Sequence, residues 1–172
     1  MKQRTANIAT VSIALFALGF SIWQGVIQRT HNHVSLEPRI NAYYSNDGKE
    51  DQEGLYIINN GMGPAFVENF EVSVDGRIIQ SGNPWKLGSA MIALGLDVNC
   101  LTIRGPRPND SFKAGEEMAL IEISKAAPKT CAITAHRMRK TFTENLDFTL
   151  TVKSIYGDRF EYKLKENIQR AL

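Results

Sequence analysis

The chain has 172 residues, of which 20 are Lys or Arg and 18 are Asp or Glu. The excess of positive charge comes from Lys2 and Arg4, so everything after the N-terminal apolar stretch is formally neutral. This balance gives no electrostatic argument for nucleic acid, which normally binds a basic face. About 140 residues remain beyond the apolar stretch, enough for one domain with its own core and too few for two.

Residues 8–27, IATVSIALFALGFSIWQGVI, contain no charged side chain. As a helix they would rise roughly 30 Å, the thickness of a bilayer's hydrocarbon core, which predicts a transmembrane helix. A cleaved signal peptide is the competing interpretation, but its apolar region usually covers about 7–15 residues and ends in a small-x-small cleavage site. This stretch is longer and ends through Trp23, which suits a membrane interface. The sequence therefore favours an uncleaved single-pass anchor in the lipid bilayer.

The orientation of this anchor follows from the charges on either side of it. A short basic tail, residues 1–7, precedes the span, while Arg29 and Arg39 follow it, so the difference in positive charge is small. The simplest arrangement holds the tail inside the cell and exports everything after the span.

Within the span, Ala17, Ser21 and Gly25 recur every fourth residue. Such a ridge of small side chains lets two helix backbones approach closely in lipid. The ridge is therefore a candidate packing face for another membrane protein or for a second copy of the chain. The alternative is that these small residues reflect only the ordinary composition of membrane helices.

Residues 28–38 are polar and predict a juxtamembrane linker. His31 and His33 lie in it without further Cys, His or carboxylate ligands at a fixed spacing, so we expect no metal site. The two cysteines, Cys100 and Cys131, are compatible with a disulfide in an exported domain and with separate thiols in a reducing compartment. A bridge would close a loop of about 30 residues and contribute roughly 3 kcal/mol. The spacing alone leaves both states open.

The chain from residue 39 onward shows the alternation of apolar and polar residues that is typical of strands. The predicted strands are residues 39–44, 55–58, 69–74, 77–80, 100–104, 118–123, 146–153 and 160–165. Asp75-Gly76 predicts a two-residue hairpin turn between two of them. One short helix is predicted at 84–94, with Asn83 as its cap and Pro84 at its first position.

The stretch 128–142 is ambiguous, but its apolar residues fit one face of a second helix. His136, Arg137 and Lys140 would then point outward. These three residues form either a basic patch facing lipid or, as we favour, a solvated helix face.

Together these elements predict a mainly β domain at residues 39–166, an antiparallel β-sandwich of immunoglobulin-like type with one or two short helices. Residues 167–172 are expected to be a tail. The Cys-Trp-Cys order of true immunoglobulin domains is missing, because Trp85 precedes both cysteines.

The turn-rich block NNGMGPA supplies the candidate partner contact, because its glycines could leave backbone groups accessible. The residues concerned are Asn59, Asn60, Gly61, Met62, Gly63 and Pro64. The alternative is a purely structural turn in which the glycines take positive φ.

Several short motifs resemble those of bacterial membrane-anchored proteins with one extracytoplasmic β-rich domain. They are the N-terminal span, Leu36-Glu37-Pro38, the block 59–65, Asp75-Gly76 and the SIYGD turn at 154–158. The resemblance implies a membrane anchor, export and a β-rich fold. Together with the charges that flank the span, it favours a bacterial inner-membrane protein with a cytoplasmic N-terminus and an exported domain. It implies no catalytic residue and no cofactor, because that family has no agreed activity.

The inventory of reactive groups predicts a protein that is not an enzyme. No Ser-His-Asp pattern, zinc signature or paired-carboxylate motif stands out, so we name no catalytic residue, metal site or cofactor. The favoured function is a membrane-tethered interaction module, an accessory or scaffold subunit that holds another membrane or envelope protein. The alternative is a small-ligand or sensor domain that binds in a pocket beneath the helix around Trp85.

Overall fold

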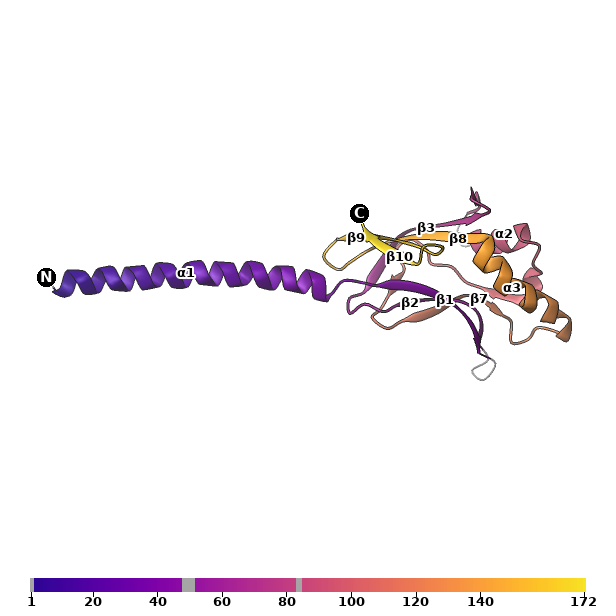
Figure 1. Cartoon of the computed structure of the whole chain (residues 1–172), viewed down its shortest axis with the longest axis horizontal. Coiled ribbons are helices and arrows are strands. Elements are labelled where there is room, and N and C mark those ends of the chain that lie inside the picture. The colour runs from indigo at the N-terminus through magenta and orange to yellow at the C-terminus, as the bar shows by residue number, and fades with distance from the viewer. Residues whose placement is uncertain (1, 48–51, 83–84) are drawn as a thin grey trace. The chain divides into compact units, whose positions relative to one another are not determined.

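The computed structural model describes residues 2–47, 52–82 and 85–172 (Figure 1). The chain divides into two compact units, Met1–Ser35 and Leu36–Leu172. Among these described residues, the first unit is a single apolar helix, and the second holds two antiparallel sheets with two further α-helices. The fold is therefore mainly β, as the sequence predicted.

Helix α1 (Lys2–Ser35) forms the first unit. Its segment Thr10–Ser35 reaches a mean hydropathy of 1.7, buries none of that apolar surface within the structure, and is long and apolar enough to cross a membrane. The helix continues through the first eight residues of the predicted linker. These residues contain neither Gly nor Pro, and the next helix-breaking residue is Pro38.

All strand pairs in the second unit are antiparallel. The first sheet has the order β1 (Ile40–Asp47), β2 (Gln52–Asn59), β7 (Glu117–Ile123), β5 (Leu101–Ile103). The second has the order β10 (Ile168–Ala171), β9 (Arg159–Lys163), β8 (Leu146–Lys153), β3 (Ala65–Val74), β4 (Arg77–Ile78), with β6 (Ser111–Phe112) paired to the start of β3.

One hydrophobic core draws on both sheets, which lie one above the other in Figure 1. Strand β8 illustrates how the alternation predicted from the sequence produces this core, because every second residue from Leu146 is buried. The ring of Phe148 lies 5.3 Å from that of Phe70 and 5.9 Å from that of Tyr162, between centroids. These aromatic contacts join β8 to its neighbours on both sides.

Helices α2 (Lys86–Ala93) and α3 (Ala132–Glu144) match the two predicted helices closely. The proposed cap and first residue of the former, Asn83 and Pro84, lie outside the described residues. Two short 3-10 turns, η1 (Val98–Cys100) and η2 (Lys129–Cys131), precede β5 and α3.

The C-terminus differs from the predicted tail, because residues 168–171 form β10 beside β9. No apolar alternation marks this strand, and none of its side chains is buried. Backbone pairing and the side chain of Gln169 hold it in place.

Candidate binding cleft

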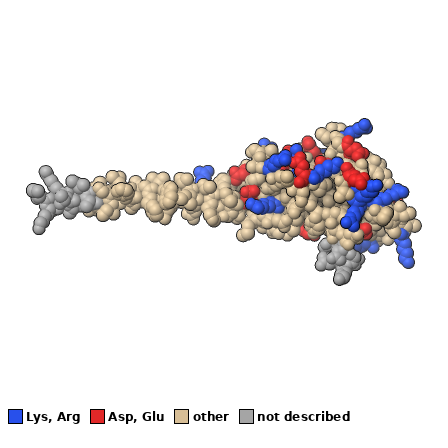
Figure 2. Space-filling model, in the orientation of Figure 1, with Lys and Arg blue, Asp and Glu red and all other residues tan. Residues whose placement is uncertain are grey.

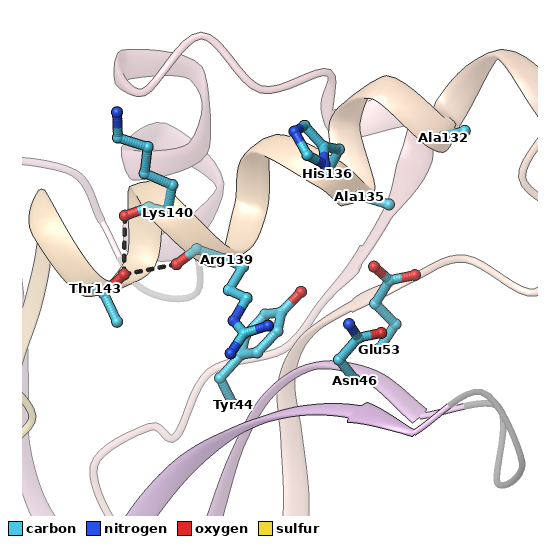
Figure 3. Close-up of a pocket in the computed structure, with 9 residues that line it drawn as sticks. All are labelled: Tyr44, Asn46, Glu53, Ala132, Ala135, His136, Arg139, Lys140 and Thr143. Atoms are coloured by element: carbon cyan, nitrogen blue, oxygen red, sulfur yellow. Dashed lines mark hydrogen bonds between the residues drawn. The ribbon is translucent and has the colours of Figure 1, made fainter.

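A cleft of about 740 Å³ lies between the β1–β2 hairpin and α3 (Figure 3). The strands contribute Tyr44, Asn46 and Glu53. Helix α3 contributes the remaining residues: Ala132, Ala135, His136, Arg139, Lys140 and Thr143. The alanines leave room beneath the helix, and seven of the nine lining residues have a side chain that carries charge or can form hydrogen bonds.

The apolar side of α3 fixes this helix on the core. Met138 and Phe142 are buried, and the ring of Phe142 meets that of Tyr44 edge-on with 6.1 Å between centroids. With this side held down, the adjacent side of the helix forms one wall of the cleft. The hydroxyl of Thr143 donates to the carbonyl oxygens of Arg139 (2.7 Å) and Lys140 (3.0 Å), so it is satisfied within the helix.

Tyr44, Glu53 and Arg139 form the electrostatic centre of the cleft. Figure 3 shows Arg139 extending from α3 toward Tyr44, whereas Lys140 extends the opposite way. Burial raises the pKa of Tyr44, the Glu53 carboxylate raises it further, and the Arg139 guanidinium opposes both effects. The phenol therefore keeps its proton at neutral pH and can donate a hydrogen bond to an anion.

Positive charge is concentrated in the segment that contains α3. Residues 125–144 hold five Lys or Arg residues and one acidic residue, whereas the rest of the second unit holds twelve and seventeen. Several blue side chains accordingly gather in Figure 2 at the end of the domain where α3 lies. The formally neutral composition thus conceals a basic region on an otherwise acidic domain.

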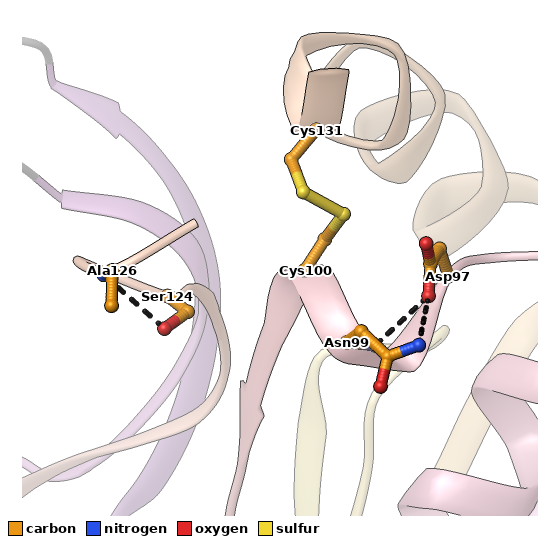
Figure 4. Close-up of a disulfide and its surroundings, with 6 residues drawn as sticks. All are labelled: Asp97, Asn99, Cys100, Ser124, Ala126 and Cys131. Carbon is orange, nitrogen blue, oxygen red and sulfur yellow. Dashed lines mark hydrogen bonds between the residues drawn. A yellow bond between two sulfur atoms is a disulfide. The ribbon is translucent and has the colours of Figure 1, made fainter. Parts of the chain in front are cut away.

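A disulfide between Cys100 and Cys131 fixes the start of α3, with 5.5 Å between the Cα atoms (Figure 4). It joins η1 to η2, and both cysteines are buried. The Asp97 carboxylate accepts a hydrogen bond from the backbone N–H of Asn99 at 3.0 Å and caps η1. The two candidate cysteines are therefore brought together in the structure.

The candidate contact loop has a different environment from the one expected. Asn59 and Gly63 are fully buried or nearly so, and Gly61 is half-buried, while Asn60 and Met62 are exposed. Neither glycine takes positive φ. Gly61 and Gly63 are needed instead because the backbone of another segment approaches this loop closely.

The backbone that approaches this loop belongs to residues 36–39, called here the incoming segment. A Cβ on Gly61 would lie 2.4 Å from the carbonyl oxygen of Glu37, and one on Gly63 would overlap the carbonyl of Leu36. The glycines therefore leave their backbone buried against the incoming segment, which corrects the expectation that they leave it accessible.

The Asn59 side chain fastens the incoming segment to the domain. Its Oδ1 accepts from the backbone N–H groups of Arg39 and Gly61, each at 3.0 Å. Its Nδ2 donates to the carbonyl oxygens of Gly63 (2.8 Å), Phe112 (3.2 Å) and Lys113 (3.2 Å). One amide thus joins three separate segments.

A second attachment comes from the C-terminal strands. Gln169 donates to the carbonyl of Pro38 (2.7 Å) and accepts from the N–H of Ile40 (2.8 Å). The Tyr162 hydroxyl accepts from the N–H of Ala42 (2.9 Å) and donates to Asn167 (2.8 Å). These side chains cap the outer edge of β1 at its first residues.

The other sequence candidates lie apart from the cleft. Ala17, Ser21 and Gly25 share one exposed side of α1, and the Ser21 hydroxyl donates to the Ala17 carbonyl at 2.9 Å. Residues 28–35 of the predicted juxtamembrane linker are also helical, with Ser35 Oγ 3.0 Å from His31 Nδ1. Within the described residues, no group of three His, Cys, Asp or Glu side chains is placed to hold a metal.

Trp85 lies at the start of α2 with its side chain exposed. Its side chain is 69 % exposed, and the inner side of α2 is filled by fully buried Leu87, Ala90 and Met91. The structure therefore offers no support at Trp85 for the alternative function considered from the sequence.

Sequence reasoning named His136 and Lys140, which line the cleft, and Arg137, which does not, but it missed Arg139 and the opposite wall. Tyr44 and Glu53 carry no signal of their own, because only the folded hairpin sets them opposite Arg139. Comparison of the chain with models of protein families, with curated proteins and with solved structures finds no match.

Proposed function

We propose that this protein is a membrane-tethered interaction module, an accessory or scaffold subunit that holds another membrane or envelope protein. In this proposal α1 crosses a bacterial inner membrane with its N-terminus in the cytoplasm, and the unit Leu36–Leu172 lies outside. The observation that supports this proposal most directly is the apolar segment Thr10–Ser35, whose surface is not buried within the structure. Apolar surface of that extent requires lipid or another helix.

Two features of the domain support its export and its architecture. A disulfide is typical of oxidising compartments outside the cytoplasm. The strand orders β1-β2-β7-β5 and β4-β3-β8-β9 follow the A-B-E-D and C′-C-F-G arrangement of immunoglobulin folds, with β10 added beyond the last strand. On that basis we propose an immunoglobulin-like β-sandwich.

The cleft beside α3 is the surface we assign to partner binding. Its Arg139, Glu53 and Tyr44 side chains can bind charged groups and form hydrogen bonds with a partner. We assign no reaction to the cleft. The alternative, a sensor of a small ligand, is supported by one observation: a volume of about 740 Å³ is within the range of small-molecule sites.

The tether and the interaction can be tested in one preparation of cell membranes. The full chain should resist extraction by alkaline carbonate, and its domain should be cut by protease only from the outer side of the membrane. After chemical cross-linking, the tagged chain should be recovered with one other envelope protein in a fixed ratio. Release of a shortened chain that lacks α1 would instead identify residues 8–27 as a cleaved signal peptide.

A further inference from the structure

The inference concerns the class of partner that the cleft accepts, and it rests on the proposed function. We infer that the cleft binds an extended acidic segment of the partner protein. A carboxylate of that segment pairs with Arg139 and accepts a hydrogen bond from Tyr44. The partner contact thereby moves from the loop at residues 59–64 to the opposite end of β1.

The first argument is that, in the part of the chain that the structure describes, no ion pair engages the cations of the cleft. Among the described residues, the ion pairs found involve other side chains, and none includes Arg139, Lys140 or Glu53. An Arg guanidinium presents a planar set of N–H donors that matches a carboxylate in two parallel hydrogen bonds. Arg139 is therefore available to an external carboxylate.

The second argument is that Tyr44 supplies an uncharged hydrogen-bond donor that complements Arg139. Its pKa is raised by burial and by Glu53, so its hydroxyl is protonated throughout the physiological range. Figure 3 shows the Arg139 side chain extending toward this phenol, and both residues line the cleft, so the two donors face the same space. A carboxylate bound by Arg139 can thus accept from Tyr44 as well.

The third argument is that Glu53 restricts what else can enter. It stands on the hairpin wall opposite α3 (Figure 3). A uniform polyanion such as a nucleic acid would meet this carboxylate and the acidic remainder of the domain. A peptide can direct its acidic side chains to α3 and its backbone N–H groups to Glu53, so a peptide segment fits the charges better.

The test uses the full chain in a non-ionic detergent and a fluorescent probe, acetyl-hexaglutamyl amide, with its binding followed by anisotropy. Arg139→Glu should weaken binding at least tenfold. Arg137→Glu is the matched control, because Arg137 is exposed on the same helix but does not line the cleft. It should change binding less than threefold, and Glu53→Gln should strengthen it about two- to fivefold by removing repulsion.

Four results would overturn the inference. They are equal losses for both arginine variants, no preference for the glutamyl probe over a seryl-glycyl peptide, equal binding of duplex DNA, and equal binding of anionic phospholipid vesicles. Arg139 is exposed, so its variant should keep the thermal midpoint of the parent chain. Recovery of a partner in unchanged ratio with Arg139→Glu would reject the cleft while leaving the proposed function intact.

Discussion

Asn59 should be the most sensitive polar position in the domain. Asn59→Ala removes the acceptor for two backbone N–H groups, those of Arg39 and Gly61, and the donor for three carbonyls. The residue is fully buried, so water cannot replace these bonds without rearrangement. An unsatisfied buried donor costs about 1–3 kcal/mol, which gives about 3–5 kcal/mol for the whole substitution when the carbonyls lose their donor as well.

Urea unfolding of the full chain in mild detergent, followed by the circular dichroism of the β domain, measures this loss. With a urea dependence of about 2 kcal/mol per molar, the midpoint should fall by about 2 M. The matched control is Asn60→Ala, which deletes the same amide from an exposed neighbour and should cost less than about 0.5 kcal/mol. Equal midpoints for the two variants would refute the role assigned to Asn59.

A second substitution at the same position separates hydrogen bonding from size. Asn59→Asp keeps the acceptor and the shape but sets a carboxylate against the three carbonyl oxygens that now receive the amide protons. Repulsion and burial both disfavour the charged form, so the variant should be weakest at neutral pH and regain stability as the pH falls. A pH-independent loss would contradict this reasoning.

Three further predictions concern the incoming segment, the core and the disulfide. Gly63→Ala should destabilise the domain by about 1–3 kcal/mol through backbone overlap, whereas Gly82→Ala, which meets open space, should be neutral in the same thermal melt. Tyr162→Phe should cost about 1–3 kcal/mol, because the N–H of β1 that it caps loses its acceptor. Burial raises the pKa of Tyr162 above its unfolded value, so the parent domain should lose stability as the pH rises beyond about 10, and titration of the variant should show a smaller loss. Cys131→Ser should lower the free energy of unfolding by about 3 kcal/mol in denaturant titrations. This loss should be no larger than the loss that reduction of the disulfide causes in the parent chain.

The strands and helices that pack against the core could be predicted because burial imposes a period on the sequence. The alternation in β8 and the helical spacing around Met138 are direct consequences of one buried side. Strand β10 has no such side, and it is held by backbone pairing and by Gln169, so its pattern resembles that of a tail.

The candidate site was only half predictable for a related reason. The basic residues of α3 lie close together in the sequence, whereas Glu53 and Tyr44 reach them only through the pairing of β1 with β2 and the seating of α3. The glycines of the 59–65 block were noticed, but their purpose depends on a segment more than twenty residues away, which no local pattern reveals.

The most direct test of the central claim is the native mass of the full chain, extracted from its own membranes in mild detergent. We expect one complex in which the chain and another envelope protein occur in a fixed ratio, and we expect this complex to survive Arg137→Glu. A monomer with nothing bound, in membranes that contain the uncleaved chain, would contradict the account.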